Sequence, residues 1–153
     1  MTAYFLALIG GQLFAVDKER VVGVGTRDES KVKPLEDEGR KFLPLANSDM
    51  ALICDLLPHM PLQKGQPRCT HYLLVRQQGL FMALPMLGKG RLVQADDTAR
   101  QSLPPAFTGM DRRLIHSVLV NCRDIILMLD LDTLAEVSDE TATATASFQG
   151  MEA

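Results

Sequence analysis

Apolar residues in this chain occur in short runs that are separated by glycines, prolines and charged residues. Residues 3–9 form the first run, Gly10 and Gly11 follow, and a second run occupies residues 13–16. Paired glycines supply the positive φ angles of a tight hairpin turn, so this stretch predicts strand, turn, strand. The stretch HYLLVRQQGLFMALPM at 71–86 repeats the same order around its Gln-Gln-Gly turn.

Other apolar runs of strand length predict further strands. They are expected at residues 21–25, 41–46, 50–57, 91–94, 114–120 and 125–129. Residues 26–40 are rich in charge and contain a proline and a glycine, which indicates a surface loop. Pro85 confines its strand to a sheet edge or a bulge, because proline has no N–H to donate. Three prolines between residues 58 and 69 predict a boundary between two lobes.

Many short strands joined by turn signals are typical of an all-β sandwich or barrel. The helical pattern is brief, since LDTLAEV at residues 131–137 gives about two turns. Residues 138–153 are polar, small and repetitive in Thr and Ala, so we expect them to form a disordered tail. The sequence thus predicts a mainly β chain with a short C-terminal helix.

One apolar stretch, LVNCRDIILMLDLDTL at residues 119–134, ends in two aspartates. Its run IILML does not alternate with polar residues, which predicts a central strand that is buried on both faces. A buried, unpaired carboxylate is costly. We therefore expect Asp130 at the exit of the strand and Asp132 as the N-cap of the following helix. A Mg²⁺ or acid/base pair is the alternative, but no further carboxylates occur at a recognisable spacing.

Composition narrows the class of protein. Hydrophobic residues make up 46% and charged residues 23% of the 153 positions, which is ordinary for one globular domain or two small lobes. The net charge is −3 with both signs interspersed, and Trp is absent, so a nucleic-acid surface is not expected. The apolar start lacks a preceding Lys or Arg and is split by glycines, which favours a hairpin over a signal peptide. We expect no membrane insertion.

Cysteines and histidines offer few sites for chemistry. An odd number of cysteines without a CxxC pair suits a reducing cytoplasm. Four residues could be considered as zinc ligands: Cys54, His59, Cys69 and His71. Their spacing does not form a zinc knuckle. Cys122 and His116 flank a predicted hairpin turn and are the best pair for a thiol enzyme, although no oxyanion hole is recognisable. We predict no catalytic residue, cofactor or metal.

Two segments together resemble a known family. The first is the opening YFLALIGGQLFAVDKERVVGV, and the second is LPPAFTGMDRRLIHSVLVNCRDIILMLDLDTLAEV at residues 103–137. Both are similar to the CheW-like domain, the coupling module of bacterial chemosensory arrays. Together with the stretch HYLLVRQQGLFMALPMLGKGRLV at residues 71–93, the resemblance covers most of residues 3–137. Family members carry an Asn-Leu-Arg-Gly motif before a strand, and here Arg40 takes the place of the motif's arginine, followed by the strand of Phe42.

The resemblance implies a fold and a role. It implies two five-stranded SH3-like β-barrels over a shared core within a domain at 1–137, with lobes at about 10–57 and 71–130 and a first strand that both lobes can share. It implies a non-catalytic cytoplasmic adaptor that couples a CheA-type histidine kinase to chemoreceptors or binds other CheW-like domains. The expected contact positions are Val22, Val24, Arg40 and Phe42. An alternative is a divergent module of another motility or signalling complex that lacks receptor contacts.

Overall fold

The computed structural model describes most of the chain up to the end of a C-terminal helix. The described residues are 2–26, 35–37, 39–45, 49–56, 69–96, 100–103, 105, 112–121 and 124–137. The strands are β1 (Thr2–Ile9), β2 (Gln12–Asp17), β3 (Val21–Thr26), β4 (Leu35–Asp37), β5 (Arg40–Pro44), β6 (Met50–Ile53), β7 (His71–Gln77), β8 (Leu80–Ala95), β9 (Arg100–Gln101), β10 (Ile115–Asn121) and β11 (Asp124–Leu129). Short 3₁₀ helices occur at η1 (Lys18–Arg20) and η4 (Arg112–Leu114), and an α-helix occupies 131–137.

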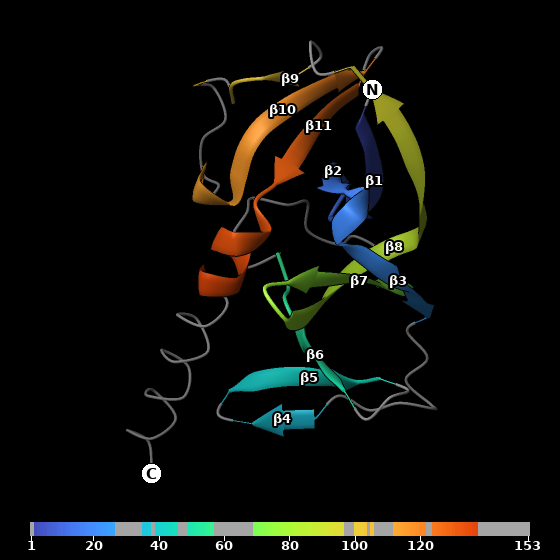
Figure 1. The fold of residues 1–153 in the computed structure, drawn as a ribbon, viewed down its shortest axis with the longest axis vertical. Coiled ribbons are helices and arrows are strands. Elements are labelled where there is room, and N and C mark those ends of the chain that lie inside the picture. Colours follow the sequence, from blue (N-terminus) through green and yellow to red (C-terminus); the bar gives the residue numbers. More distant parts are fainter. Residues whose placement is uncertain are drawn as a thin grey trace.

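The strands form two sheets that share the long strand β8 (Figure 1). In sheet A the order is β8, β1, β2, β11, β10, β9, and in sheet B it is β3, β7, β8, β6, β5, β4. Each sheet has a small apolar cluster of its own, around Tyr4 and Leu119 in sheet A and around Tyr72 and Ala83 in sheet B. The prediction of an all-β fold with two small barrels and a short C-terminal helix is confirmed.

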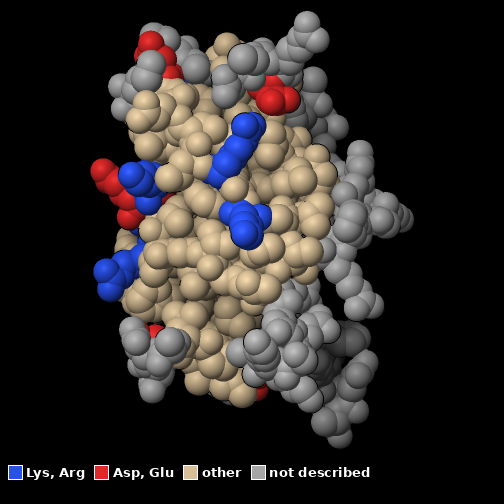
Figure 2. Space-filling model, turned by 90° about the vertical axis from the view of Figure 1, so that its right-hand side faces the viewer, with Lys and Arg blue, Asp and Glu red and all other residues tan. Residues whose placement is uncertain are grey.

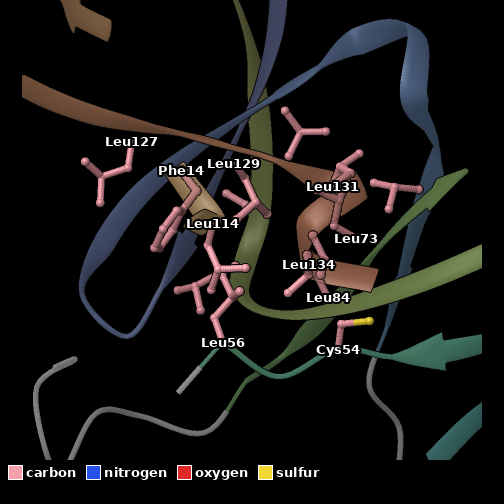
Figure 3. Packing of buried hydrophobic residues seen from close by; sticks show 14 of the residues in the cluster. Phe14, Cys54, Leu56, Leu73, Leu84, Leu114, Leu127, Leu129, Leu131 and Leu134 are labelled. Carbon is pink, nitrogen blue, oxygen red and sulfur yellow. The ribbon is translucent and has the colours of Figure 1, made fainter. Parts of the chain in front are cut away.

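A larger apolar core joins the two sheets. Phe14 of β2 and Leu129 of β11 meet Leu73 of β7 and Leu84 of β8 there, and the C-terminal helix adds Leu134 (Figure 3). Because side chains alternate along a strand, one set of positions faces the barrel interior and the other set faces this shared core. Burial of each such side chain contributes about 1.5–3 kcal/mol, so the two sheets and the helix stabilise one another.

Two glycines bend β8 where it leaves sheet B and joins sheet A. Gly88 and Gly90 have φ angles of 78° and 68°, which side chains with a Cβ adopt only with strain. The pairing of β1 with β8 shifts register between Leu6 and Leu8, next to this bend. A Cβ on Gly90 would lie 2.4 Å from the Phe5 ring and 2.7 Å from the Leu6 carbonyl oxygen. The strand predicted at 91–94 is therefore the second half of a longer, bent strand.

Strand pairing follows a different division from the predicted lobes. The stretch 10–57 includes β2, yet β2 pairs with β1 and β11 in sheet A. The stretch 71–130 includes β7, yet β7 pairs with β3 in sheet B. A pattern of apolar runs indicates where strands lie but not which strands pair. The predicted lobes differ from the sheets because the chain passes from one sheet to the other at η1 and again at the β8 bend. The predicted tail at 138–153 and most of the predicted linker lie outside the described residues.

The prediction of one continuous surface loop at 26–40 is wrong in part, because β4 and the first residue of β5 lie within it. Leu35 pairs with Phe42, and Glu36 pairs with the oppositely charged Lys41. Gly39 supplies the turn with a φ of 79°. Cross-strand pairs of this kind stabilise a hairpin even where one strand is rich in charge.

Asp130 is the N-cap, so the assignment of that role to Asp132 is wrong. The Thr133 N–H donates to Asp130 Oδ1 at 3.2 Å, and the Leu134 N–H donates to the Asp130 carbonyl at 3.0 Å. The helix begins directly after β11, which leaves no room for a later cap. Asp132 is exposed in the first turn, where a negative charge favours the helix dipole. The strand before the cap is central and buried from Ile126 onward, as predicted, whereas Ile125 is 49% exposed.

Candidate partner-binding surface

An apolar, uncharged strand lies at one edge of sheet B. Among the described strands β3 pairs only with β7, so its other side forms a sheet edge. Val22 and Val24 are 54% and 40% exposed, and the residue between them, Gly23, is partly buried. An edge with unpaired backbone groups and aliphatic side chains is suited to contact with another protein. We call Val22 and Val24 the β3 surface.

A second group of exposed apolar side chains occupies one face of β4, β5 and β6. Leu35 lies opposite Phe42, and Met50 lies opposite Pro44, so all four share a face. Leu35 and Met50 are about half exposed. The guanidinium of Arg40 lies over the Phe42 ring at 5.8 Å from its centroid, a cation–π contact that orients the arginine. We call these five residues the β5 surface.

The four predicted contact residues fall into two pairs. Arg40 and Phe42 touch each other on β5, and Val22 and Val24 are neighbours on β3. Both strands belong to sheet B, but β7, β8 and β6 come between them in the order of pairing. The described pairing therefore does not bring the four into one patch, and their role in binding stays a prediction.

Sequence reasoning missed several exposed apolar side chains. Leu35 and Met50 extend the β5 surface, and four more lie elsewhere: Leu80, Leu92, Val120 and Ile125. Val120 and Ile125 face each other across the β10–β11 hairpin. Met50 and Ile125 are the first apolar residues of their predicted strands. The sequence alone does not distinguish these exposed residues from the buried residues that follow them in the same strands. Leu35 was hidden because its neighbours in the chain are charged.

The face that contains β3 and the upper half of β8 carries few charges. Viewed from the right-hand side of Figure 1, most of the described surface is formed by uncharged residues, with isolated Lys and Arg side chains near its centre (Figure 2). In the described ranges no helix is long and apolar enough to cross a membrane. Contact through such a surface would depend on shape and apolar burial more than on charge.

The residues considered for chemistry do not form a site in the described part of the chain. There, no group of three or more His, Cys, Asp or Glu side chains is placed to hold a metal ion. His59 and Cys122 lie outside the described residues, so the zinc and thiol-enzyme hypotheses that include them stay untested. His116 is exposed, and its Nδ1 lies 3.1 Å from the Ser117 hydroxyl. Cys54 is buried in the shared core with its Sγ 3.6 Å from the Leu52 carbonyl.

Comparison with solved structures decides the fold. No protein-family model matches the sequence, and no curated protein matches it. The crystal structure of the scaffolding protein TtCheW from Thermoanaerobacter tengcongensis is similar, with a TM-score of 0.71 at 15% sequence identity over 87% of this chain and 86% of that one. The chain has the CheW-like fold. Its all-β character and its single short helix in the described residues agree with that fold, and the long common coverage means that neither chain has a large part the other lacks.

Proposed function

We propose that this CheW-like chain is a non-catalytic scaffold of a bacterial chemosensory system, which couples a CheA-type histidine kinase to chemoreceptors in the cytoplasm. The observation that carries the proposal is the match of nearly the whole chain to a protein described as a scaffold. A scaffold works by binding, and the described surface offers two apolar areas, the β3 surface and the β5 surface.

The β5 surface supplies the chemistry of a reversible protein contact. Arginine and aromatic residues are enriched at the centres of interfaces because they bury much area and still form polar contacts. Arg40 is held over Phe42 and is half-buried, so part of its side-chain entropy is already lost before a partner binds. Leu35 and Met50 add apolar area on the same face.

Charge reversal at Arg40 tests this surface. We expect Arg40→Glu to weaken binding of the purified chain to a CheA-type kinase from the same genome at least tenfold, about 1.4 kcal/mol, in isothermal titration calorimetry. Arg76→Glu is the matched control, because Arg76 lies over the Phe81 ring at 5.4 Å on a different strand. Far-UV circular dichroism of both variants should equal that of the parent chain. Equal affinities for Arg40→Glu and Arg76→Glu would count against the β5 surface.

A second candidate function is a module of another motility or signalling complex that makes no receptor contact. It is favoured by one feature of the sequence: Arg40 follows Glu38 and Gly39, so the Asn and Leu of the family's motif are missing. A chain of this kind would bind a kinase but not the cytoplasmic tip of a chemoreceptor. Titration with a receptor fragment from the same genome separates the two, since only the first function predicts binding.

A further inference from the structure

The two halves of the described chain repeat one pattern of strands and turns. Tyr72, Gly79 and Ala83 of the β7–β8 hairpin follow Tyr4, Gly11 and Ala15 of the β1–β2 hairpin at one constant spacing. The turns have the same backbone conformation, with φ angles of 59° and 83° at residues 10 and 11 and of 47° and 82° at residues 78 and 79. Both are two-residue hairpin turns with positive φ at each central position.

The later strands correspond as well. β6 runs parallel to β8 with Leu52 opposite Met82, and β11 runs parallel to β2 with Leu127 opposite Phe14. Phe14 and Met82 hold equivalent places in the two hairpins, so β6 and β11 are equivalent strands. Read from β8 to β9 in sheet A and from β3 to β4 in sheet B, the two sheets have the same order and the same strand directions. The two halves are residues 2–56 and 69–137.

The halves exchange strands. The first half gives β1 and β2 to sheet A but β3 to β6 to sheet B, whereas the second half gives β7 and the start of β8 to sheet B and its remaining strands to sheet A. Each sheet therefore contains two pairings between halves: β1 with β8 and β2 with β11 in sheet A, and β3 with β7 and β6 with β8 in sheet B.

Neither half can complete a sheet or bury its apolar face alone. In the shared core Phe5, Phe14 and Val16 come from the first half, and they pack in one cluster with Leu73 and Leu84 of the second half. Half of the chain would leave this face in water together with the open edges of four strands. An interface of this composition resembles a domain core that has been divided in two.

We propose that a second copy of this chain can supply the complementary half, which gives a strand-exchanged dimer. Residues 2–56 of each copy then pair with residues 69–137 of the other. Every strand pairing and core contact of the described residues is retained, because the exchange is made at the connection between residues 56 and 69. Exchange of identical elements is a low-cost route to a dimer for this reason. This inference does not depend on the proposed function.

Strand exchange requires that the shared core opens, so native monomers convert to the exchanged dimer slowly. When unfolded chains refold together, each half can pair with its own chain or with another copy. Mass action then sets the product, because a tenfold increase in free monomer concentration raises the ratio of dimer to monomer tenfold. The exchanged dimer differs from any surface dimer in one respect. Residues that face each other across β1 and β8 come from different copies.

A disulfide between copies tests this. Ala3 and Gln94 are direct partners across β1 and β8, and neither is buried. Directly opposed residues of antiparallel strands lie within disulfide reach. Ala3→Cys is placed in one tagged chain and Gln94→Cys in another, both in a background in which Cys54 is alanine and Cys69 and Cys122 are serine. The two chains are unfolded together, refolded over a tenfold range of concentration and oxidised.

We expect a covalent heterodimer whose ratio to monomer rises between about threefold and tenfold across that range, depending on how much of the chain is dimeric, and almost none when the two native monomers are mixed without unfolding. A single chain with both cysteines forms the internal disulfide and shows that the variants fold and that the pair closes. Ala3→Cys mixed with Ser102→Cys is the mismatched control. Equal yields for the matched and mismatched pairs, or no heterodimer at any concentration, would overturn the proposal.

Discussion

Replacement of Gly90 by alanine tests the bend that carries β8 from one sheet to the other. Gly90 has a φ of 68°, and a Cβ there would lie 2.4 Å and 2.5 Å from two ring carbons of Phe5. It would also lie 2.7 Å from the Leu6 carbonyl oxygen. The ring could turn away, but the backbone oxygen cannot move without disturbing the pairing of β1 with β8.

The expected cost has two parts. A residue with a Cβ at this φ is destabilised by about 1–2 kcal/mol. Crowding in a packed region adds about 1–3 kcal/mol. The total loss in the free energy of unfolding is about 2–5 kcal/mol, a large part of the stability of a typical domain. Gly88→Ala should have the same cost from its positive φ, which is 78°. It should have no cost from crowding, because nothing lies within 4 Å of a Cβ placed there.

Urea unfolding followed by far-UV circular dichroism measures the difference, since the chain has no Trp. With a slope of about 2 kcal/mol per M, Gly90→Ala should lower the midpoint by about 1–2.5 M and Gly88→Ala by about 0.5–1 M. Any gain from a stiffer unfolded chain is the same for both variants. Equal midpoints for the two variants would refute the assigned contact of Gly90 with Phe5 and Leu6.

Two further predictions concern the C-terminal helix. Asp130→Ala should lower the free energy of unfolding by about 1 kcal/mol, whereas Asp130→Asn should retain most of the stability because asparagine also caps helices; equal losses in urea unfolding would contradict the capping role. Leu134→Ala should cost about 2–5 kcal/mol because Leu134 is fully buried in the shared core. Leu80→Ala, at a residue that is 59% exposed, should change the midpoint little. Similar losses at Leu134 and Leu80 would show that the helix is not packed on the core.

Local signals in the sequence were enough to predict most strands. The β1–β2, β7–β8 and β10–β11 hairpins follow from apolar runs on either side of turn residues, and the short helix follows from its apolar spacing. These features depend on residues that are neighbours in the chain. The prediction that Pro85 lies at a sheet edge also follows from a local property, the missing N–H of proline. In the structure Pro85 pairs with β7 on one side of β8, and on the other side β6 has already ended.

Features that depend on distant residues could not be predicted in this way. β4 is short and rich in charge, and only its pairing with β5 makes it a strand. The N-cap was placed two residues too late because the pattern does not show that β11 leads directly into the helix. The partners of several strands depend on the β8 bend, where Gly88 and Gly90 allow one strand to pair in both sheets.

The candidate surfaces also combine features that could be predicted from the sequence with features that depend on residues distant in the chain. The resemblance to the CheW-like family suggested Val22 and Val24 as contact positions, and both are exposed. The cation–π contact between Arg40 and Phe42 follows from their positions two residues apart on one strand. Leu35 and Met50 join them only through cross-strand pairing, which a single sequence does not reveal.

Reconstitution of a signalling complex is the most direct test of the central claim that this chain couples a kinase to receptors. Receptor-containing vesicles and a CheA-type kinase from the same genome are combined with increasing amounts of the chain, and kinase autophosphorylation is measured. The chain should raise the rate at a concentration set by its affinity, attractant should lower the raised rate, and Arg40→Glu should require at least tenfold more protein. An autophosphorylation rate that stays unchanged at saturating chain, with or without attractant, would contradict a coupling role.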